Sequence, residues 1–166
     1  MNKNIVLVGF MGAGKSVTAK QLQELSQRSL VSTDELIEKK EGKAISRIFQ
    51  ENGEAYFRDL ERKVIEEISR KENLIIDCGG GVILDQGNID NLKKNGVIFY
   101  LKVSPEIIYE RIKHETHRPL LKVDNPKIKI KELLEKRQSR YEQADQIIDT
   151  SGKTIDQVAG SILKLI

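Results

Sequence analysis

A run of eight residues near the start of the chain has the composition of a phosphate-binding loop. The pattern G-x-x-x-x-G-K-[ST] is met in full by Gly9-Phe10-Met11-Gly12-Ala13-Gly14-Lys15-Ser16. In such a loop, glycines let backbone N–H groups wrap a phosphate, and the N-terminus of the next helix adds partial positive charge. The lysine reaches the β- and γ-phosphates of ATP, and the hydroxyl after it can bind Mg²⁺. The residues predicted to bind ATP here are Gly12, Ala13, Gly14, Lys15, Ser16 and Val17, with Mg²⁺ at Ser16.

The segments on both sides of the loop have the context that the motif requires. Ile5-Val6-Leu7-Val8 is a continuous apolar run, typical of a strand buried on both faces, and a helical pattern extends from about Lys15 to Arg28. The side chains expected on the inner face of this helix are Val17, Ala19, Leu22 and Leu25. A chance glycine-rich turn is the alternative, and it would meet the four fixed positions in roughly 1% or fewer of chains this long. The sequence therefore predicts nucleotide binding, without saying what accepts the phosphate.

Strand and helix patterns alternate along the rest of the chain. Further strands are expected at 30–31, 74–77, 97–101 and 147–149. Further helices are expected at about 35–40, 44–50, 54–71, 105–114, 128–144 and 154–166. Such alternation predicts an α/β fold with a parallel sheet covered on both faces. No repeat or linker interrupts it, so we expect one domain over residues 1–166.

The composition is ordinary for a globular protein, with 32% charged and 39% hydrophobic residues. The formal net charge is +3 and the basic residues are scattered among acidic ones, which argues only weakly for a nucleic-acid partner. The single cysteine, Cys78, cannot form an internal disulfide. The apolar run from Ile5 to Met11 is too short to span a membrane. We expect a cytoplasmic monomer that acts on small molecules, without nucleic-acid or membrane partners.

A GTPase is one class that the loop allows and the rest of the sequence disfavours. Asp77-Cys78-Gly79-Gly80 formally supplies the D-x-x-G motif of that class. The class also needs an N-K-x-D guanine-binding motif on a later strand. The Asn-Lys pair of this chain is Asn2-Lys3, which precedes the first strand and has no Asp two positions on.

Five further motifs follow the loop in a fixed order. They are Asp34, Phe57-Arg58-x-x-Glu61, Gly79-Gly80-Gly81, Arg118-Pro119-Leu120-Leu121 and Lys136-Arg137-x-x-x-Tyr141. In this order and spacing they resemble shikimate kinase nearly from end to end. The resemblance implies a three-layer P-loop fold with a five-stranded parallel sheet, helices on both faces, shikimate-binding helices at about 34–62 and a mobile lid at about 114–125. It also implies transfer of the γ-phosphate of ATP to the 3-hydroxyl of shikimate, a step toward chorismate and the aromatic amino acids.

The resemblance assigns roles to three side chains that would contact the acceptor. Asp34 would hold the acceptor hydroxyl and take its proton. Arg58 and Arg137 would bind the shikimate carboxylate through paired N–H donors, with Glu61 orienting Arg58. From the residues alone, plainer alternatives stay open: a helix cap for Asp34, an ion pair with Glu54 or Glu61 for Arg58, and one more charge on a basic helix for Arg137.

The resemblance also implies backbone and lid contacts. Gly79, Gly80 and Gly81 would let backbone N–H groups approach the substrate, Gly80 above all, although a strand-ending turn is the alternative. Arg118 would close over the phosphates and neutralise charge on the transferred group. Arg111 and Lys153 would contact adenine.

One position departs from the family pattern. The family usually has Asp-x-Asp after the second strand, and its first Asp helps to hold the hydration shell of Mg²⁺. This chain has Ser32 there, which could instead cap the next helix in a capping box with Glu35. We hypothesise that Asp77, at the end of the third strand, supplies the missing carboxylate as an outer-sphere contact. The alternative is that Asp77 merely accepts backbone hydrogen bonds at the strand end.

Two other functions stay open at this point. One is a related P-loop kinase for another polyol or a nucleoside monophosphate. The other is a nucleotide-binding protein that has lost catalysis, which Ser32 makes conceivable. The two arginines and the triple glycine favour a carboxylated ring alcohol as acceptor. The presence of Lys15, Ser16, Asp34 and Arg118 argues against loss of catalysis.

Overall fold

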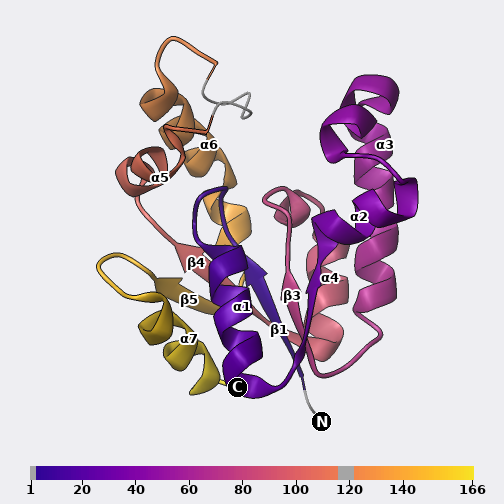
Figure 1. Cartoon of the computed structure of the whole chain (residues 1–166), viewed down its shortest axis with the longest axis vertical. Helices are drawn as coiled ribbons and strands as arrows, with labels where there is room; N and C mark the ends of the chain where they lie inside the picture. The colour runs from indigo at the N-terminus through magenta and orange to yellow at the C-terminus, as the bar shows by residue number, and fades with distance from the viewer. Residues whose placement is uncertain (1–2, 116–121) are drawn as a thin grey trace.

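The computed structural model describes residues 3–115 and 122–166 and contains a five-stranded parallel sheet in the order β2-β3-β1-β4-β5 (Figure 1). The strands are β1 (Asn4–Val8), β2 (Ser29–Ser32), β3 (Leu74–Asp77), β4 (Gly96–Lys102) and β5 (Gln146–Asp149). The helices are α1 (Lys15–Ser26), α2 (Thr33–Glu41), α3 (Ile45–Ile68), α4 (Gln86–Asn95), α5 (Pro105–Ile112), α6 (Pro126–Tyr141) and α7 (Ile155–Leu163), with a 3₁₀ turn at Val82–Leu84. The predicted α/β fold with a parallel sheet of five strands is confirmed.

The two faces of the sheet carry two separate cores. Along β1, Val6 and Val8 pack into a core with α2, α3 and α4, whereas Ile5 and Leu7 pack into a core with α1, α5 and α7. All of β1 is buried, as its continuous apolar run predicts, because successive side chains point to opposite faces and both faces are covered. Figure 1 shows α2 and α3 on one side of the carboxyl end of the sheet and α5 and α6 on the other.

The predicted inner face of α1 is partly wrong. Ala19 and Leu22 are buried, but Val17 and Leu25 are 49% and 53% exposed, and Thr18 is buried instead. The helix begins directly at the end of the loop, where Gly14 has a left-handed φ of 89°. That junction fixes how the helix is rotated on the sheet, and it turns Val17 toward the cavity beside the loop.

Two predicted helices form a single element with a break inside it. Helix α3 contains Gly53 at φ 82° and ψ 173°, a conformation that lies outside the helical region. The break falls between the predicted segments 44–50 and 54–71. After it, Phe57, Val64 and Ile68 are buried at helical spacing, as predicted.

Helix α4 was not predicted from the sequence. Its ten residues include Gly87 and several asparagines, which have low helix propensity, and its apolar side chains are few. The available signals were Asp85, which accepts a hydrogen bond from the N–H of Gly87 as N-cap, and the spacing of Ile89 and Leu92, which are both buried. Tertiary packing of these two side chains stabilises a helix that local propensity disfavours.

Half of the predicted lid at 114–125 lies outside the described residues, and Arg118 is in that half. Within 3–115 and 122–166, no helix is both long enough and apolar enough to cross a membrane.

Candidate active site

The phosphate loop joins the end of β1 to the start of α1. Gly12 and Gly14 have left-handed φ angles of 76° and 89°, which side chains other than glycine rarely adopt. A Cβ at Gly12 would also lie 2.8 Å from a methyl group of Ile112 on α5. The ammonium of Lys15 donates to the carbonyls of Gly9 and Phe10 at 2.8 and 3.1 Å. The loop therefore curves around its own lysine, as a phosphate-binding loop does.

A cavity of about 470 Å³ lies beside this loop at the carboxyl ends of three neighbouring strands. Its lining comes from the loop, from the junction of β2 with α2, from the end of β3 and the segment after it, and from Glu115 in the predicted lid. Because parallel strands all end at the same edge of the sheet, motifs far apart in the sequence meet there. The predicted site residues that line it are Gly12, Gly14, Lys15, Ser16, Val17, Asp34, Asp77, Gly79 and Gly80.

Asp34 lies in the first turn of α2 and faces the triple glycine. The helix cap is Ser32, whose Oγ accepts from the N–H of Glu35 at 3.3 Å, so Asp34 is not needed as a cap. A Cβ at Gly79 would lie 2.5 Å from Oδ1 of Asp34, which means that the carboxylate rests against the backbone of that glycine. The N–H of Gly79 donates to Thr33 Oγ1 at 2.9 Å and holds this junction together.

The pKa of Asp34 is raised from its ordinary value, mainly because the side chain is largely buried. Lys15 and Arg58 lower this pKa through their positive charge, whereas Asp77 and Glu38 raise it further. Asp34 is thus a carboxyl group of enhanced basicity placed next to the phosphate loop. Such a group can accept a proton from an alcohol that is held beside it.

Arg58 extends from α3 over the other end of the triple glycine. Its guanidinium pairs with Glu61 at 2.8 Å and with Glu54 at 3.3 Å, so the ion pairs expected from spacing are present. A Cβ at Gly81 would lie 2.6 Å from Nη2 of Arg58. The Glu61 side chain is 1% exposed, and burial raises its pKa while Arg58 lowers it. The ion pair with Glu61 therefore helps to hold Arg58 against Gly81.

Arg137 and Tyr141 approach the same glycines from α6. The Tyr141 hydroxyl donates to the carbonyl of Gly80 at 3.1 Å, and Nη1 of Arg137 lies 3.5 Å from that oxygen. The Arg137 guanidinium also lies over the ring of Phe10, 5.6 Å from its centre. Burial raises the pKa of Tyr141 to about 12, so its hydroxyl stays protonated and able to donate. Tyr141 belongs to the motif Lys136-Arg137-x-x-x-Tyr141, but the spacing of that motif does not predict this contact.

The carboxylate of Asp77 lies beside the last residue of the phosphate loop. Ser16 Oγ donates to Asp77 Oδ2 at 2.6 Å, and Asp77 is 8% exposed. Burial raises the pKa of Asp77, while the bond from Ser16 and the charge of Lys15 lower it. A hydroxyl and a carboxylate oxygen are donors that suit Mg²⁺, which is usually held by one or two protein oxygens together with phosphates and water. The side-chain bond comes from a hydroxyl rather than from a backbone N–H, contrary to the plainer alternative for Asp77.

The residues predicted to contact adenine lie apart from this cavity's lining. Arg111 is exposed on α5 and its Nη1 donates to the carbonyl of Gly12 at 2.9 Å, so it contacts the phosphate loop. Lys153 lines a different hollow along the start of α7, together with Asp156 and Gln157. Their assignment to adenine stays a prediction.

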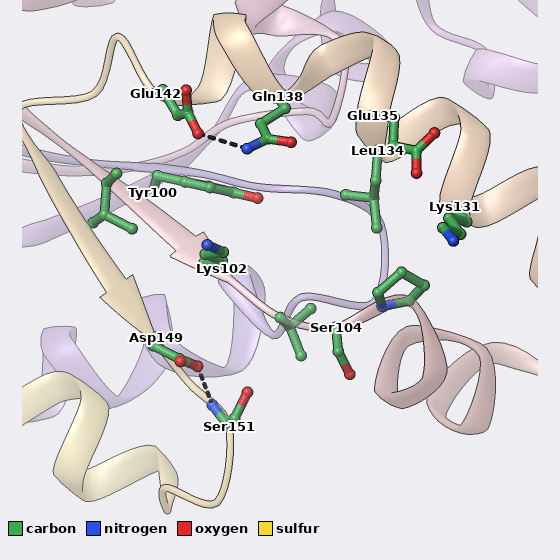
Figure 2. Close-up of a pocket in the computed structure, with 13 residues that line it drawn as sticks. Tyr100, Lys102, Ser104, Lys131, Leu134, Glu135, Gln138, Glu142, Asp149 and Ser151 are labelled. Carbon is green, nitrogen blue, oxygen red and sulfur yellow. Dashed lines mark hydrogen bonds between the residues drawn. The ribbon is translucent and has the colours of Figure 1, made fainter.

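A further cavity of about 380 Å³ lies where β4 and β5 face α6 (Figure 2). Tyr100 and Leu134 form part of its apolar floor, and Lys102, Glu142 and Asp149 stand around it. It contains none of the predicted site residues. Lys15 and Asp34, which are predicted to be catalytic, line the cavity beside the phosphate loop instead.

Comparisons of the sequence with known proteins identify shikimate kinases as relatives of this chain. A family model described as shikimate kinase matches residues 11–166. The chain is 49% identical to a shikimate kinase of Thermodesulfovibrio yellowstonii, over 98% of this chain and 94% of the relative. It is 45% identical to one of Caldanaerobacter subterraneus subsp. tengcongensis, over 98% and 95%.

Solved structures agree with the sequence comparisons. The shikimate kinase of Acinetobacter baumannii in complex with shikimate superposes with a TM-score of 0.92 at 37% identity, covering 99% of this chain and 93% of that one. The shikimate kinase of Aquifex aeolicus superposes with a TM-score of 0.85 at 35% identity, covering 97% and 94%.

Proposed function

This chain belongs to the shikimate kinase family, and we propose that it transfers the γ-phosphate of ATP to the 3-hydroxyl of shikimate. The observation that carries the proposal is the meeting of Asp34, Arg58 and Arg137 at the triple glycine, next to the phosphate loop. A substrate with a hydroxyl and a carboxylate suits this arrangement. The Asp34 carboxylate can take the proton of the hydroxyl, and the two guanidinium groups can bind the carboxylate.

The acceptor would be held from three helices. Arg58 on α3 and Arg137 on α6 bind the shikimate carboxylate, since each guanidinium offers two parallel donors. Asp34 on α2 then orients the 3-hydroxyl toward the loop and accepts its proton as the phosphorus–oxygen bond forms. Among the described residues, the N–H groups of Gly80 and Gly81 have no hydrogen-bond partner, and we assign them to the substrate's oxygens.

The phosphate donor would be held by the loop and by Lys15. The backbone of Gly12, Ala13 and Gly14 wraps the phosphates, and the ammonium of Lys15 moves from the loop carbonyls to the β- and γ-phosphates. Ser16 provides the protein oxygen for Mg²⁺, which neutralises charge on the phosphate oxygens when it is bound.

Several parts of the proposal lie beyond the described cavity. We assign Arg118 to the transferred phosphoryl group, and Arg111 and Lys153 to adenine, on the resemblance of their motifs alone. A cytoplasmic monomer without nucleic-acid or membrane partners also stays a prediction.

One coupled assay tests the proposed function. ADP release is followed with shikimate, gluconate, CMP or UMP as acceptor, and with no acceptor. We expect a rate with shikimate far above all the others. A shikimate rate equal to the rate without acceptor would overturn the proposal, and a higher rate with another acceptor would show a related kinase instead.

Gly81→Ala is expected to weaken shikimate binding without unfolding the protein. The new Cβ would lie 2.6 Å from Nη2 of Arg58, so the guanidinium must move away, whereas the backbone at Gly81 has an ordinary φ of −98°. A displacement of about 1 Å in a substrate-positioning group can cost roughly 100-fold in rate. We expect the KM for shikimate to rise about tenfold or more, with the KM for ATP unchanged within about threefold.

Gly160→Ala is the matched control for this substitution. Gly160 lies in α7, and a Cβ there would meet nothing within 4 Å. For both variants, the KM values are measured by steady-state kinetics and the folded state is checked by thermal unfolding. An unchanged shikimate KM in a folded Gly81→Ala protein would show that Arg58 does not act from its position over Gly81.

A further inference from the structure

Ser32 and Asp77 are register partners at the carboxyl ends of neighbouring strands. Each is the last residue of its strand, β2 for Ser32 and β3 for Asp77, and the two are paired in the parallel ladder. Adjacent strands lie about 4.8 Å apart, and paired residues point to the same face of the sheet. Both side chains accordingly line the cavity beside the phosphate loop. A carboxylate at either position could serve the same small volume.

At this edge of the cavity the carboxylate is supplied by Asp77. Its Oδ2 accepts from Ser16 Oγ at 2.6 Å, which places the carboxylate one hydrogen bond away from the hydroxyl that a P-loop offers to Mg²⁺. With 8% exposure, Asp77 has little contact with bulk water, and burying a carboxylate is costly unless it has strong partners. Among the described residues, its hydrogen-bond partner is this one hydroxyl, so a hydrated cation would add substantially to its stabilisation.

The side chain of Ser32 is occupied in another way. Its Oγ accepts from the N–H of Glu35 at 3.3 Å and so caps α2. A neutral hydroxyl engaged in a helix cap cannot provide the negative charge that attracts the water shell of Mg²⁺. Asp34, the next carboxylate along, rests against Gly79 on the acceptor side of the cavity.

We infer that Asp77 holds a water ligand of nucleotide-bound Mg²⁺, and that this role can be exchanged between positions 77 and 32 because the two are paired across β2 and β3. The inference rests on the proposed function, since it concerns the metal–nucleotide complex of the same site. It adds that the carboxylate can be carried by either of the two paired strands, β2 or β3, at this edge of the sheet.

Asp77→Asn tests the first half of the inference. Asparagine keeps the size of the side chain and can still accept from Ser16, but it removes the charge. The affinity for ADP is measured by calorimetry in Mg²⁺ and in EDTA, and the Mg²⁺ concentration that gives half-maximal rate is measured with shikimate. Loss of an outer-sphere partner typically costs about 10–100-fold in metal affinity. We expect at least about a tenfold rise in the Mg²⁺ requirement, with ADP affinity in EDTA unchanged.

The exchange tests the second half. Asp77→Ser should raise the Mg²⁺ requirement as Asp77→Asn does. Ser32→Asp/Asp77→Ser should bring it back to within about threefold of the wild type, because both side chains line the same cavity and the new carboxylate can replace the lost one. The effects of the two substitutions should therefore be non-additive. Asp90→Asn is the matched control, since Asp90 is exposed on α4 and bonds to Gln86. It should change neither measurement.

Two results would overturn the inference: an Asp77→Asn protein with the wild-type Mg²⁺ requirement, or an exchanged protein no better than Asp77→Ser although its unfolding temperature is normal. If Asp77→Ser does not fold, Ser32→Asp/Asp77→Asn replaces the exchanged protein, and it should bring the Mg²⁺ requirement of Asp77→Asn back toward that of the wild type. Calorimetry with ADP needs no acceptor, so the Mg²⁺ dependence of binding reports on Asp77 even if shikimate gives no rate. Failure of the inference and failure of the proposed function are thereby separate outcomes.

Discussion

Asp34→Asn is expected to lower the kcat for shikimate phosphorylation by about 10²–10⁴-fold, the usual contribution of a positioned general base. The amide fits the same space against Gly79, but it cannot take the proton of the acceptor hydroxyl. The KM for ATP should change little, because the phosphates are held by the loop. Steady-state kinetics with each substrate varied in turn make the measurement, and Asp90→Asn on the surface of α4 is the control.

The pH dependence of the wild-type enzyme should report the same carboxyl group. Burial raises the pKa of Asp34, so kcat should fall as the pH drops through this raised pKa, at a higher pH than an ordinary aspartate would give. Asp34→Asn should abolish that acid limb. A kcat within threefold of the wild type would contradict the assignment of Asp34 as the base.

The stability of Asp34→Asn shows whether its loss of kcat is a chemical effect or a consequence of unfolding. The folded state binds a proton at Asp34 more readily than the unfolded state does, because the pKa is higher in the folded protein. The contribution of this group to the free energy of unfolding therefore decreases as the pH rises from the unfolded pKa to the folded one, and it stays low above that. Removing the charge should leave the unfolding temperature at neutral pH unchanged or higher. A large loss of kcat together with an unchanged unfolding temperature would be a chemical effect.

The fold could be predicted well from the sequence because its strands are continuous apolar runs. Ile5–Val8 and Leu74–Asp77 are short, bounded by turn signals and buried on both faces, so periodicity and length agree. Helix α4 was missed because its stability comes from contacts of Ile89 and Leu92 with distant parts of the chain. Val17 was misplaced because the loop, rather than the apolar pattern, sets the rotation of α1.

The composition of the site was predictable, whereas its contacts were not. The phosphate-loop motif indicates Lys15, the family resemblance indicates Asp34 and Arg58, and helical spacing alone gives the pair between Arg58 and Glu61. The bond from Ser16 to Asp77 joins residues that are 61 positions apart, and it depends on the order of strands in the sheet. The hydrogen bond from the Tyr141 hydroxyl to the carbonyl of Gly80 likewise depends on where α6 crosses that end of the sheet. Such contacts follow from tertiary placement, which local patterns do not encode.

Arg58→Ala is expected to raise the KM for shikimate by about 100-fold or more, since it removes a pair of charge-assisted hydrogen bonds worth roughly 1.5–3 kcal/mol each when made to a carboxylate. The KM for ATP should stay within about threefold. The same substitution leaves the Glu61 carboxylate, 1% exposed, without its cation, and Oε2 of Glu61 already has no hydrogen-bond partner among the described residues. We therefore also expect a loss of up to about 3 kcal/mol in the free energy of unfolding, because Arg58 is itself only partly buried.

Arg58→Ala/Glu61→Gln separates binding from stability. Glutamine removes the stranded charge, so the unfolding temperature should recover most of the loss seen in Arg58→Ala. The KM for shikimate should stay about 100-fold above the wild type, because no guanidinium returns to face Gly81. Kinetics and thermal unfolding of the wild type, the single variant and the double variant decide between two roles. A shikimate KM that recovers together with the unfolding temperature would make Arg58 a structural partner of Glu61 and not a ligand of the substrate. A KM that stays high in a stable protein would place the guanidinium on the carboxylate of shikimate.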